Sequence, residues 1–492
     1  MVENKNLPEK VFNLIDGKEV PPDDNEFLEK VNPHNGSILT HYPRSKSSDI
    51  NKAVEYACKT SYSWANFSPV KRGDILFQIA EKMKANAETL AYYVHLDTGK
   101  SPKDALGETY GAIQLAYFMA GEGQRFYGKT TTSSTQNKYP IIIREPVGTA
   151  ALIMAFNTPI ANIAWKVFPA LISGNTAVIK PSEDIPLTTW YFGKLLLESA
   201  LPEGICNIVY GLGNEAGDSL VRNPDINLIS FTGSTEVGRN IAKVAGERLA
   251  KIFLELGGKN PLVVCDDADL ENAVKWVLLS AFSNAGQRCA ACSRVIVYES
   301  IYDSFKEMLL EAAGKLKIGN TNEDDLGPII NSKQLNNMLN DIREAEAEGA
   351  RLLTGGNRTD DIEHKNGFYL KPTIIDNVTA DQNISRKELF GPVTNLYSVK
   401  NFSEALSLAN NSPYGLTASI HTRDINKATE FTRKVQAGVA VINGGTYGSE
   451  PNMPFGGVKN SGNGWREPGT EAIDVYTNYK NIITFAYPEK ML

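Results

Sequence analysis

From residue 149 onward the chain alternates short apolar, β-branched runs with stretches of helical length, and this alternation constrains the fold most. Strands are predicted at residues 150–155, 176–180, 205–210 and 227–231, with helices at 160–172, 187–199 and 215–221 and another after Ser234. Connections of this length return each strand parallel to its neighbour, and strands covered on both faces are continuously apolar. We therefore predict an open, mostly parallel α/β sheet, which binds ligands at the carboxyl ends of its strands.

A second run of the same kind begins near Gly257. Its predicted strands lie at residues 261–265, 294–298, 373–375, 418–421 and 438–443, and a helix is predicted at 302–316. The glycine pattern differs from that of the first run, which favours a second α/β domain. Ahead of both, residues 47–126 predict three amphipathic helices; Ser68-Pro69 and Ser101-Pro102 are helix starts in which a capping hydroxyl precedes a proline.

Two further β segments, residues 139–145 and 482–487, fit neither domain. Both are short, apolar and β-branched. An exposed strand edge of this kind is usually covered or paired with another chain. We therefore predict a small β arm that joins subunits.

Composition excludes several classes of protein. The chain has 50 Lys+Arg against 57 Asp+Glu, a net charge of −7, whereas a dedicated nucleic-acid binder needs a basic stripe. The apolar stretch 149–179 is interrupted by polar residues and a turn, so no membrane span is predicted. The first ten residues carry charges of both signs and no apolar core, so we expect no signal peptide. The odd number of cysteines, five, fits a reducing cytoplasm.

The most specific motif is N-A-G-Q-R-C at residues 284–289. A cysteine after Gly-Gln and before a strand is well placed as a nucleophile on a loop, and polar Gln287 and Arg288 argue against a purely apolar role for Cys289. Cys292 completes a CxxC, but neither a second cysteine pair nor clustered histidines accompany it, so we expect no metal. A thioredoxin-type role is disfavoured because the pair leads into a strand. Three cysteines are expected to be buried packing residues: Cys58, Cys206 and Cys265.

A catalytic thiol needs an activator, because its ordinary pKa of about 8.5 leaves it protonated at neutral pH. Glu255 follows the apolar strand 252–254 and precedes two glycines, and a carboxylate in apolar surroundings can act as a general base. Asn157 ends the strand 150–156, where its amide can donate to an oxyanion. Taken singly, Glu255 is also compatible with an exposed strand-end charge and Asn157 with an ordinary turn residue.

Two glycine patterns compete for a phosphate site. Residues 211–217 form GxGxxxG after a strand, one residue longer than the dinucleotide fingerprint, and include Gly213. Residues 233–238 begin with Gly233 and Ser234 and open a helix, so that Ser234 caps it while its amide groups face a pyrophosphate. Lys180 and Glu183 follow the second strand, where they can bind ribose hydroxyls.

Taken together and in order, these segments resemble the aldehyde dehydrogenase superfamily over nearly the whole chain. The resemblance rests on the Asn157 segment, F-T-G-S at 231–234, L-E-L-G-G-K-N-P at 254–261, G-Q-R-C at 286–289, E-L-F-G-P at 388–392 and P-F-G-G at 454–457. It implies that Cys289 attacks an aldehyde to give a thiohemiacetal, with the Asn157 amide and the Cys289 N–H as oxyanion hole. Hydride transfer to the nicotinamide then leaves a thioester, which water activated by Glu255 hydrolyses to a carboxylic acid.

The resemblance also implies how the cofactor is held. Lys180 and Glu183 would bind the adenine-side ribose beside the turn at Gly213. Ser234, after Gly233, would bind a phosphate, and Glu388 the nicotinamide ribose. Phe390 and Phe156 would pack nearby, and Lys166, after Trp165, would line the site. NAD is expected because Glu183 repels the 2′-phosphate of NADP; Lys180 and Ser182 could offset this, so NADP stays open.

The resemblance divides the α/β chain into three parts. A Rossmann-like cofactor-binding domain would comprise residues 1–127 and 148–256, and a catalytic domain residues 257–458. The oligomerisation arm and C-terminal tail would comprise 128–147 and 459–492. The family implies a homodimer or homotetramer that binds a small aldehyde.

The sequence leaves open the substrate and several alternative functions. Arg288 is adjacent to the nucleophile and could attract the far carboxylate of a semialdehyde, or it forms a surface ion pair. A CoA-acylating relative is one alternative, although such enzymes generally lack the Glu at position 255; a non-catalytic structural relative and a cysteine hydrolase are others. Cys292 could also protect Cys289 from over-oxidation through a reversible disulfide.

Overall fold

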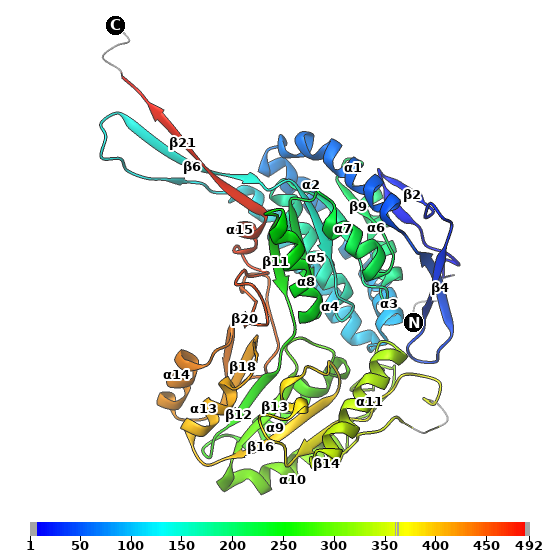
Figure 1. Cartoon of the computed structure of the whole chain (residues 1–492), viewed down its shortest axis with the longest axis vertical. Coiled ribbons are helices and arrows are strands. Elements are labelled where there is room, and N and C mark those ends of the chain that lie inside the picture. The colour runs from blue at the N-terminus through cyan, green and yellow to red at the C-terminus, as the bar shows by residue number, and fades with distance from the viewer. Residues whose placement is uncertain (1–6, 360, 362–363, 488–492) are drawn as a thin grey trace.

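The computed structural model describes residues 7–359, 361 and 364–487, and two α/β sheets with their helices lie one above the other (Figure 1). The first sheet has the strand order β11-β10-β7-β8-β9-β1-β2. The five strands from β11 to β9 run parallel, and the hairpin β1-β2 joins β9 antiparallel. The strands are β7 (Thr149–Ile153), β8 (Thr176–Lys180), β9 (Cys206–Ile208), β10 (Leu228–Thr232), β11 (Lys251–Glu255), β1 (Asn13–Ile15) and β2 (Lys18–Val20). The parallel α/β prediction is confirmed.

The direction of strand succession reverses between β7 and β10. From β7 the chain adds β8 and β9 on one side, and then β10 and β11 on the other. Such a reversal opens a crevice at the carboxyl ends of the two strands, which is where open α/β sheets bind ligands. Asn157 follows β7 and Ser234 follows β10, so both lie at this edge.

The helices before this sheet are more numerous than predicted. Four helices, not three, cover residues 47–121, because α2 and α3 are separate helices that meet at Asn86. The Ser68 and Ser101 hydroxyls accept hydrogen bonds from Lys71 N and Asp104 N, as N-caps do. The helices are α1 (Ser47–Ala65), α2 (Pro69–Ala85), α3 (Ala87–Thr98), α4 (Pro102–Gly121), α5 (Pro159–Ile172), α6 (Pro186–Leu197), α7 (Asp218–Arg222) and α8 (Thr235–Glu247).

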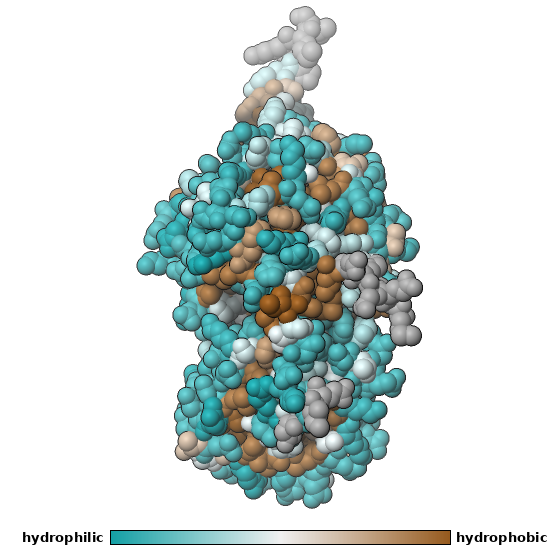
Figure 2. Space-filling model, turned by 90° about the vertical axis from the view of Figure 1, so that its right-hand side faces the viewer, coloured by the Kyte–Doolittle hydropathy of each residue, from teal (hydrophilic) through white to brown (hydrophobic). Residues whose placement is uncertain are grey.

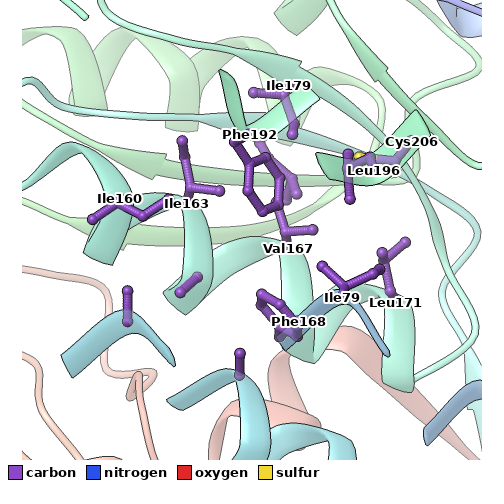
Figure 3. Close-up of a cluster of buried hydrophobic side chains, with 14 of the residues drawn as sticks. Ile79, Ile160, Ile163, Val167, Phe168, Leu171, Ile179, Phe192, Leu196 and Cys206 are labelled. Atoms are coloured by element: carbon purple, nitrogen blue, oxygen red, sulfur yellow. The ribbon is translucent and has the colours of Figure 1, made fainter. Parts of the chain in front are cut away.

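Helix α5 lies at the centre of the first core. Its apolar side chains pack against β8, α6 and β9, and Figure 3 shows them closing around Phe192. Cys206 of β9 is buried in this cluster, as its predicted packing role requires. The apolar stretch 149–179 is therefore protein core. Among the described residues, no helix combines the length and apolarity needed to cross a membrane.

The second sheet has the order β14-β15-β16-β13-β12-β18-β19, parallel except for β14. Strands β14 and β16 were not predicted. The strands are β12 (Asn260–Val264), β13 (Cys292–Tyr298), β14 (Arg351–Thr354), β15 (Thr373–Asp376), β16 (Val393–Val399), β18 (Thr417–His421) and β19 (Val439–Ile442). The helices are α9 (Leu270–Phe282), α10 (Tyr302–Ala313), α11 (Ser332–Ala347), α12 (Asn383–Arg386), α13 (Phe402–Asn410) and α14 (Ile425–Lys434).

A long two-stranded ribbon projects from the body (Figure 1). Strand β21 (Thr477–Phe485) pairs antiparallel with β6 (Lys138–Pro146) over nine residue pairs, and β5 (Lys129–Thr130) flanks it. Ile141 lies opposite Ile482, so the two predicted β segments pair with each other. Large apolar side chains on the ribbon are exposed, and Figure 2 shows apolar groups near this end of the molecule. Short strands elsewhere are β3 (Phe27–Val31), β4 (Ile38–Pro43), β17 (Tyr414–Gly415) and β20 (Val458–Lys459).

The segment 454–476 returns from the second sheet to the first. Glu255 and Gly462 form an antiparallel bridge, and Leu256 N donates to Ser461 O at 3.0 Å. The segment ends in α15 (Ala472–Tyr476), where Tyr476 is fully buried and its carbonyl accepts from Asn175 Nδ2 at 2.8 Å. This late part of the chain thus encloses the end of β11.

Candidate active site

The loop that carries Cys289 is a strained turn between α9 and β13. Asn284 and Ala285 have left-handed φ values of 54° and 52°, and Gly286 follows at 65°. A Cβ on Gly286 would overlap the backbone of Gly391, so only glycine fits there. Gln287 fixes the turn, because its Nε2 donates to Pro328 O at 3.1 Å and its Oε1 accepts from Ile330 N at 2.9 Å. Strain held by such contacts is typical of functional turns.

Cys289 is partly exposed, unlike Cys292 three residues later. It packs against a small apolar cluster that includes Ala290 and Phe455, and its carbonyl accepts from Asn260 Nδ2 at 2.8 Å. Burial of the thiol, followed by the charges of Glu255 and Glu388, raises the pKa of Cys289 to about 12. The resting sulfur therefore keeps its proton, and attack requires a base or a nearby positive charge.

Glu255 ends β11 with its side chain enclosed. Both carboxylate oxygens are buried, and neither has a hydrogen bond of ordinary geometry to any described residue; the Gly457 backbone amide lies near enough to lower the pKa, less than burial raises it. Burial dominates and raises the pKa of Glu255 well above its usual value. A Cβ on Gly456 would lie 2.7 Å from Glu255 Oε1, so the absence of a side chain at this glycine makes space for the carboxylate. A buried, unpaired carboxylate of this kind is suited to accept a proton.

Asn157 is buried, and its backbone carbonyl and side-chain oxygen both accept hydrogen bonds. Its carbonyl accepts from Lys100 Nζ at 2.9 Å and from Asn284 Nδ2 at 3.2 Å. Its Oδ1 accepts from Asn162 Nδ2 at 3.4 Å. Within the described part of the chain, no acceptor binds its Nδ2. Because Asn284 is in the Cys289 turn, the Asn157 backbone is linked directly to the nucleophile loop.

Lys166 belongs to a buried polar network beside Glu255. Its Nζ donates to Ser230 Oγ at 2.8 Å and pairs with Glu467 Oε2 at 3.3 Å. Glu467 Oε1 accepts from the Tyr476 hydroxyl at 2.6 Å. The charge of Lys166 lowers the pKa of Glu255 and that of Glu467 raises it, both less than burial does. Sequence reasoning missed Glu467 and Tyr476, because neither belongs to a local motif.

Three predicted cofactor residues meet at the carboxyl end of β8. Glu183 Oε1 pairs with Lys180 Nζ at 3.2 Å and accepts from Gly213 N at 2.6 Å. Its Oε2 remains available for a ribose hydroxyl. The Ser182 hydroxyl accepts from Asp184 N at 3.4 Å and lies at the same turn.

Gly233 and Ser234 occupy the carboxyl end of β10. Ser234 is the N-cap of α8 and its Oγ accepts from Val237 N at 3.3 Å. Gly233 N donates to Glu255 O at 3.1 Å, and a Cβ there would lie 2.5 Å from the Phe231 ring. The first turn of α8 therefore presents its amide groups toward the crevice, as an anion site requires.

Glu388 and Phe390 approach this crevice from the second domain. Glu388 Oε1 accepts from Gly258 N at 2.9 Å, and a Cβ on Gly257 would overlap its carboxylate. Burial raises the pKa of Glu388 to about 7. Phe390 has a left-handed φ of 58°, and its ring meets Phe156 edge-to-face at 5.6 Å between centroids.

Arg288 has no acidic partner among the described residues. Its guanidinium carbon lies 4.4 Å from the centroid of the Tyr447 ring, and its Nε is buried without a hydrogen bond. The alternative of a surface ion pair thus finds no support in the described part of the chain. Cys292 is buried in the core beneath α9, away from the cluster around Cys289, which favours packing over a redox role.

Comparisons with known proteins identify the family. The family model for the aldehyde dehydrogenase family matches residues 20–482. An alpha-ketoglutaric semialdehyde dehydrogenase from Bacillus subtilis is 37% identical over 96% of this chain and 97% of its own. A 2,5-dioxopentanoate dehydrogenase from Saccharolobus solfataricus is 38% identical over 93% and 96%. The crystal structure of betaine aldehyde dehydrogenase from Staphylococcus aureus in complex with NAD+ superposes with a TM-score of 0.94, at 34% identity over 96% of this chain and 95% of that one.

Proposed function

The chain belongs to the aldehyde dehydrogenase family, and we propose that it oxidises a carboxylate-bearing semialdehyde to the corresponding diacid with NAD through a thioester on Cys289. One observation carries the site assignment. The buried carboxylate of Glu255 lies near enough to the Cys289 thiol to raise its pKa, and the turn that carries Cys289 is hydrogen-bonded to the Asn157 backbone.

In the proposed first half-reaction, Cys289 Sγ gives its proton to solvent water and bonds to the aldehyde carbon. Asn157 Nδ2 and the Cys289 N–H donate to the oxygen on which negative charge develops. Bound NAD supplies the acceptor for the hydride that the carbon then loses, and a positively charged ring that favours the thiolate. The acyl group remains on Cys289 as a thioester.

In the proposed second half-reaction, Glu255 takes a proton from a water as that water attacks the thioester. The carbon–sulfur bond breaks, the acid is released and the thiol is restored. Burial makes Glu255 a stronger base than an exposed carboxylate. Lys166 and Glu467 stand beside it and set the local charge. This base favours hydrolysis over transfer to CoA.

The residues present suit a dinucleotide. Lys180 and Glu183 would hold the adenine-side ribose next to Gly213, and Ser234 with Gly233 would face the pyrophosphate. Glu388, Phe390 and Phe156 would border the nicotinamide end, and Ser182 lies beside the ribose site. These contacts support the proposed division into a cofactor-binding domain of residues 1–127 and 148–256 and a catalytic domain of residues 257–458, with Asn157, Lys166 and Glu255 reaching the reaction site from the first of them. Glu183 disfavours the extra phosphate of NADP, as expected from NAD in the Staphylococcus aureus enzyme.

The test is a spectrophotometric assay of NADH formation. Succinic semialdehyde, butanal and betaine aldehyde are compared with NAD and NADP, each with and without CoA. We expect the acidic aldehyde to have the highest kcat/KM, NAD to be preferred, and free acid to form without CoA. A CoA-dependent reaction would support the acylating alternative, and no turnover with any aldehyde would support a structural role.

Arg288 is the residue expected to select the acidic substrate. A charge-assisted hydrogen bond contributes about 1.5–3 kcal/mol, so Arg288→Gln should lower kcat/KM for succinic semialdehyde about 10–100-fold. The value for butanal should change less than about threefold, and that for cationic betaine aldehyde should rise. Steady-state kinetics measure all three; Arg423→Gln, a distant exposed arginine, is the control. Equal changes for acidic and neutral aldehydes would contradict this role.

The ribbon of β6 and β21 is proposed to join two copies of the chain into a dimer or a dimer of dimers. Its exposed apolar side chains are Tyr139, Ile141, Ile482, Ile483 and Phe485. An exposed strand edge with such side chains is normally paired. Light scattering should give a mass of at least two chains for the wild type, and Ile141→Lys/Ile483→Lys should lower it. A wild-type mass of one chain, 53.9 kDa, would refute the proposal.

The cytoplasm is the proposed compartment, because scattered, unpaired cysteines suit a reducing environment. Subcellular fractionation tests this directly.

A further inference from the structure

We propose that the buried ion pair of Lys100 and Glu108 positions Asn157 for oxyanion binding. This inference rests on the proposed function, because it concerns the donor of that same site. Lys100 and Glu108 are positioning residues: they act on the backbone around Asn157 and leave its Nδ2 free.

Lys100 reaches Asn157 from the connection between α3 and α4. Its Nζ donates to the Asn157 carbonyl at 2.9 Å and forms a short ion pair with Glu108 Oε2. The two side chains are 4% and 7% exposed, so the charges are paired in the interior. A buried ion pair adds little stability over apolar side chains of the same volume, which favours a role in geometry.

Glu108 holds the other side of the same segment. Its Oε1 accepts from Ile160 N at 3.0 Å and from Ala161 N at 3.3 Å, at the start of α5. Thr158, the N-cap residue of α5, provides no side-chain cap, so a glutamate from α4 does so instead. A carboxylate at a helix N-terminus satisfies free amide groups and suits the positive end of the dipole. Residues 157–161 are therefore fixed from both ends by one ion pair.

The backbone from which the Lys100 side chain extends is also held by packing. Gly99 has a left-handed φ of 74°, and a Cβ there would lie 2.5 Å from Pro328 Cγ. The Lys100 carbonyl and His95 Nδ1 are 2.6 Å apart, within hydrogen-bond distance. Pro328 O also accepts from Gln287, so Pro328 lies against both this connection and the Cys289 turn. Lys100 thus extends from a closely packed backbone.

The Asn157 carbonyl joins this ion pair to the nucleophile. Its second donor is Asn284 Nδ2, in the turn that leads to Cys289. Release of the carbonyl would let the Asn157 amide move relative to the sulfur. A displacement of about 1 Å in an active site can cost about 100-fold in rate.

The experiment is a double-mutant cycle on kcat/KM for aldehyde oxidation. Lys100→Met/Glu108→Gln removes both charges, and its glutamine keeps an oxygen for the two α5 amides. We expect a loss of about 10–100-fold in the wild-type background and of less than about threefold in Asn157→Ala, which itself loses about 100-fold or more. The rate at which iodoacetamide alkylates Cys289 should stay within about twofold, which shows an intact nucleophile.

The matched control is Lys103→Met. Lys103 lies three residues away and its Nζ also donates to a backbone carbonyl, that of Asn322, but it does not contact Asn157. Its activity should equal that of the wild type. The proposal would be overturned if the double variant lowered kcat/KM by the same factor in the Asn157→Ala background as in the wild type. It would also be overturned if the double variant left the kcat/KM of the wild type unchanged. If the double variant does not fold, Glu108→Gln alone is tested: its kcat/KM should fall about 3–10-fold in the wild-type background and stay unchanged in the Asn157→Ala background. If instead the wild type is active and Asn157→Ala has the same kcat/KM, the assigned role of Asn157 is refuted.

Discussion

Cys289→Ala is expected to lower kcat/KM for aldehyde oxidation by about 10⁴-fold or more, because no other group can form the covalent intermediate. NADH formation measures the loss. In the wild type, rapid quenching with mass spectrometry should find the acyl group on residue 289. Cys58→Ala is the matched control, since Cys58 is also partly exposed but lies on α1, far along the chain from the site. An active Cys289→Ala enzyme would contradict the mechanism.

The raised pKa of Cys289 gives this thiol a distinctive pH dependence. With a pKa of about 12, the thiolate fraction rises about tenfold per pH unit throughout the neutral range. Alkylation of the enzyme without cofactor should therefore be slow at pH 7 and about 100-fold faster at pH 9, without levelling off. Addition of NAD should accelerate it at pH 7. A plateau near pH 8 without cofactor would contradict a burial-dominated pKa.

Glu255→Gln is expected to separate the two half-reactions. Its amide cannot accept the proton of the attacking water, so kcat should fall by about 10²–10⁴-fold. Attack by Cys289 does not need that water, so one equivalent of NADH per subunit should still form in a rapid first turnover. Stopped-flow absorbance measures this burst, and Glu247→Gln, on the exposed end of α8, should behave as wild type. Loss of the burst together with kcat would show that Glu255 acts before hydrolysis.

The raised pKa of Glu255 also sets the sign of two pH effects. The base form appears only as pH rises through the raised value, so kcat should increase with pH on its acid limb, and Glu255→Gln should lack that limb. A carboxyl that binds its proton more tightly folded than unfolded stabilises the fold at low pH. That contribution is lost as pH rises from the unfolded to the folded pKa. Thermal unfolding at pH 8 should therefore show a higher Tm for Glu255→Gln than for the wild type.

The predictable part of the fold lay in local patterns. Continuous apolar runs separated by helical lengths predicted β7, β8, β9 and β10, and serine before proline predicted the starts of α2 and α4. The count of helices was wrong because α2 and α3 meet at a single residue, Asn86, without a proline or glycine to mark the break. Strands β14 and β16 were missed because they belong to the sheet only through pairing with distant strands.

The site residues also divide into those that belong to local motifs and those that depend on distant parts of the chain. Cys289, Glu255 and Asn157 could be proposed from the sequence because each belongs to a short motif beside a predicted strand end. Lys100 and Glu467 have no such motif: each is an isolated charge whose role depends on a partner, Asn157 or Lys166, in a remote segment. Only tertiary packing brings them together, so residue types and spacing could not identify them.

Because residues 454–476 return to the first sheet, the surroundings of Glu255 are completed only near the end of translation. The ribosome releases β11 and the Cys289 turn long before it makes the segment that buries Glu255 and supplies Glu467. Before Tyr476 is made, Glu255 lacks the contacts that enclose it, so we expect its carboxylate to be hydrated and its pKa to lie near the ordinary value. We therefore expect an unfinished chain to lack the base that the proposed hydrolysis requires.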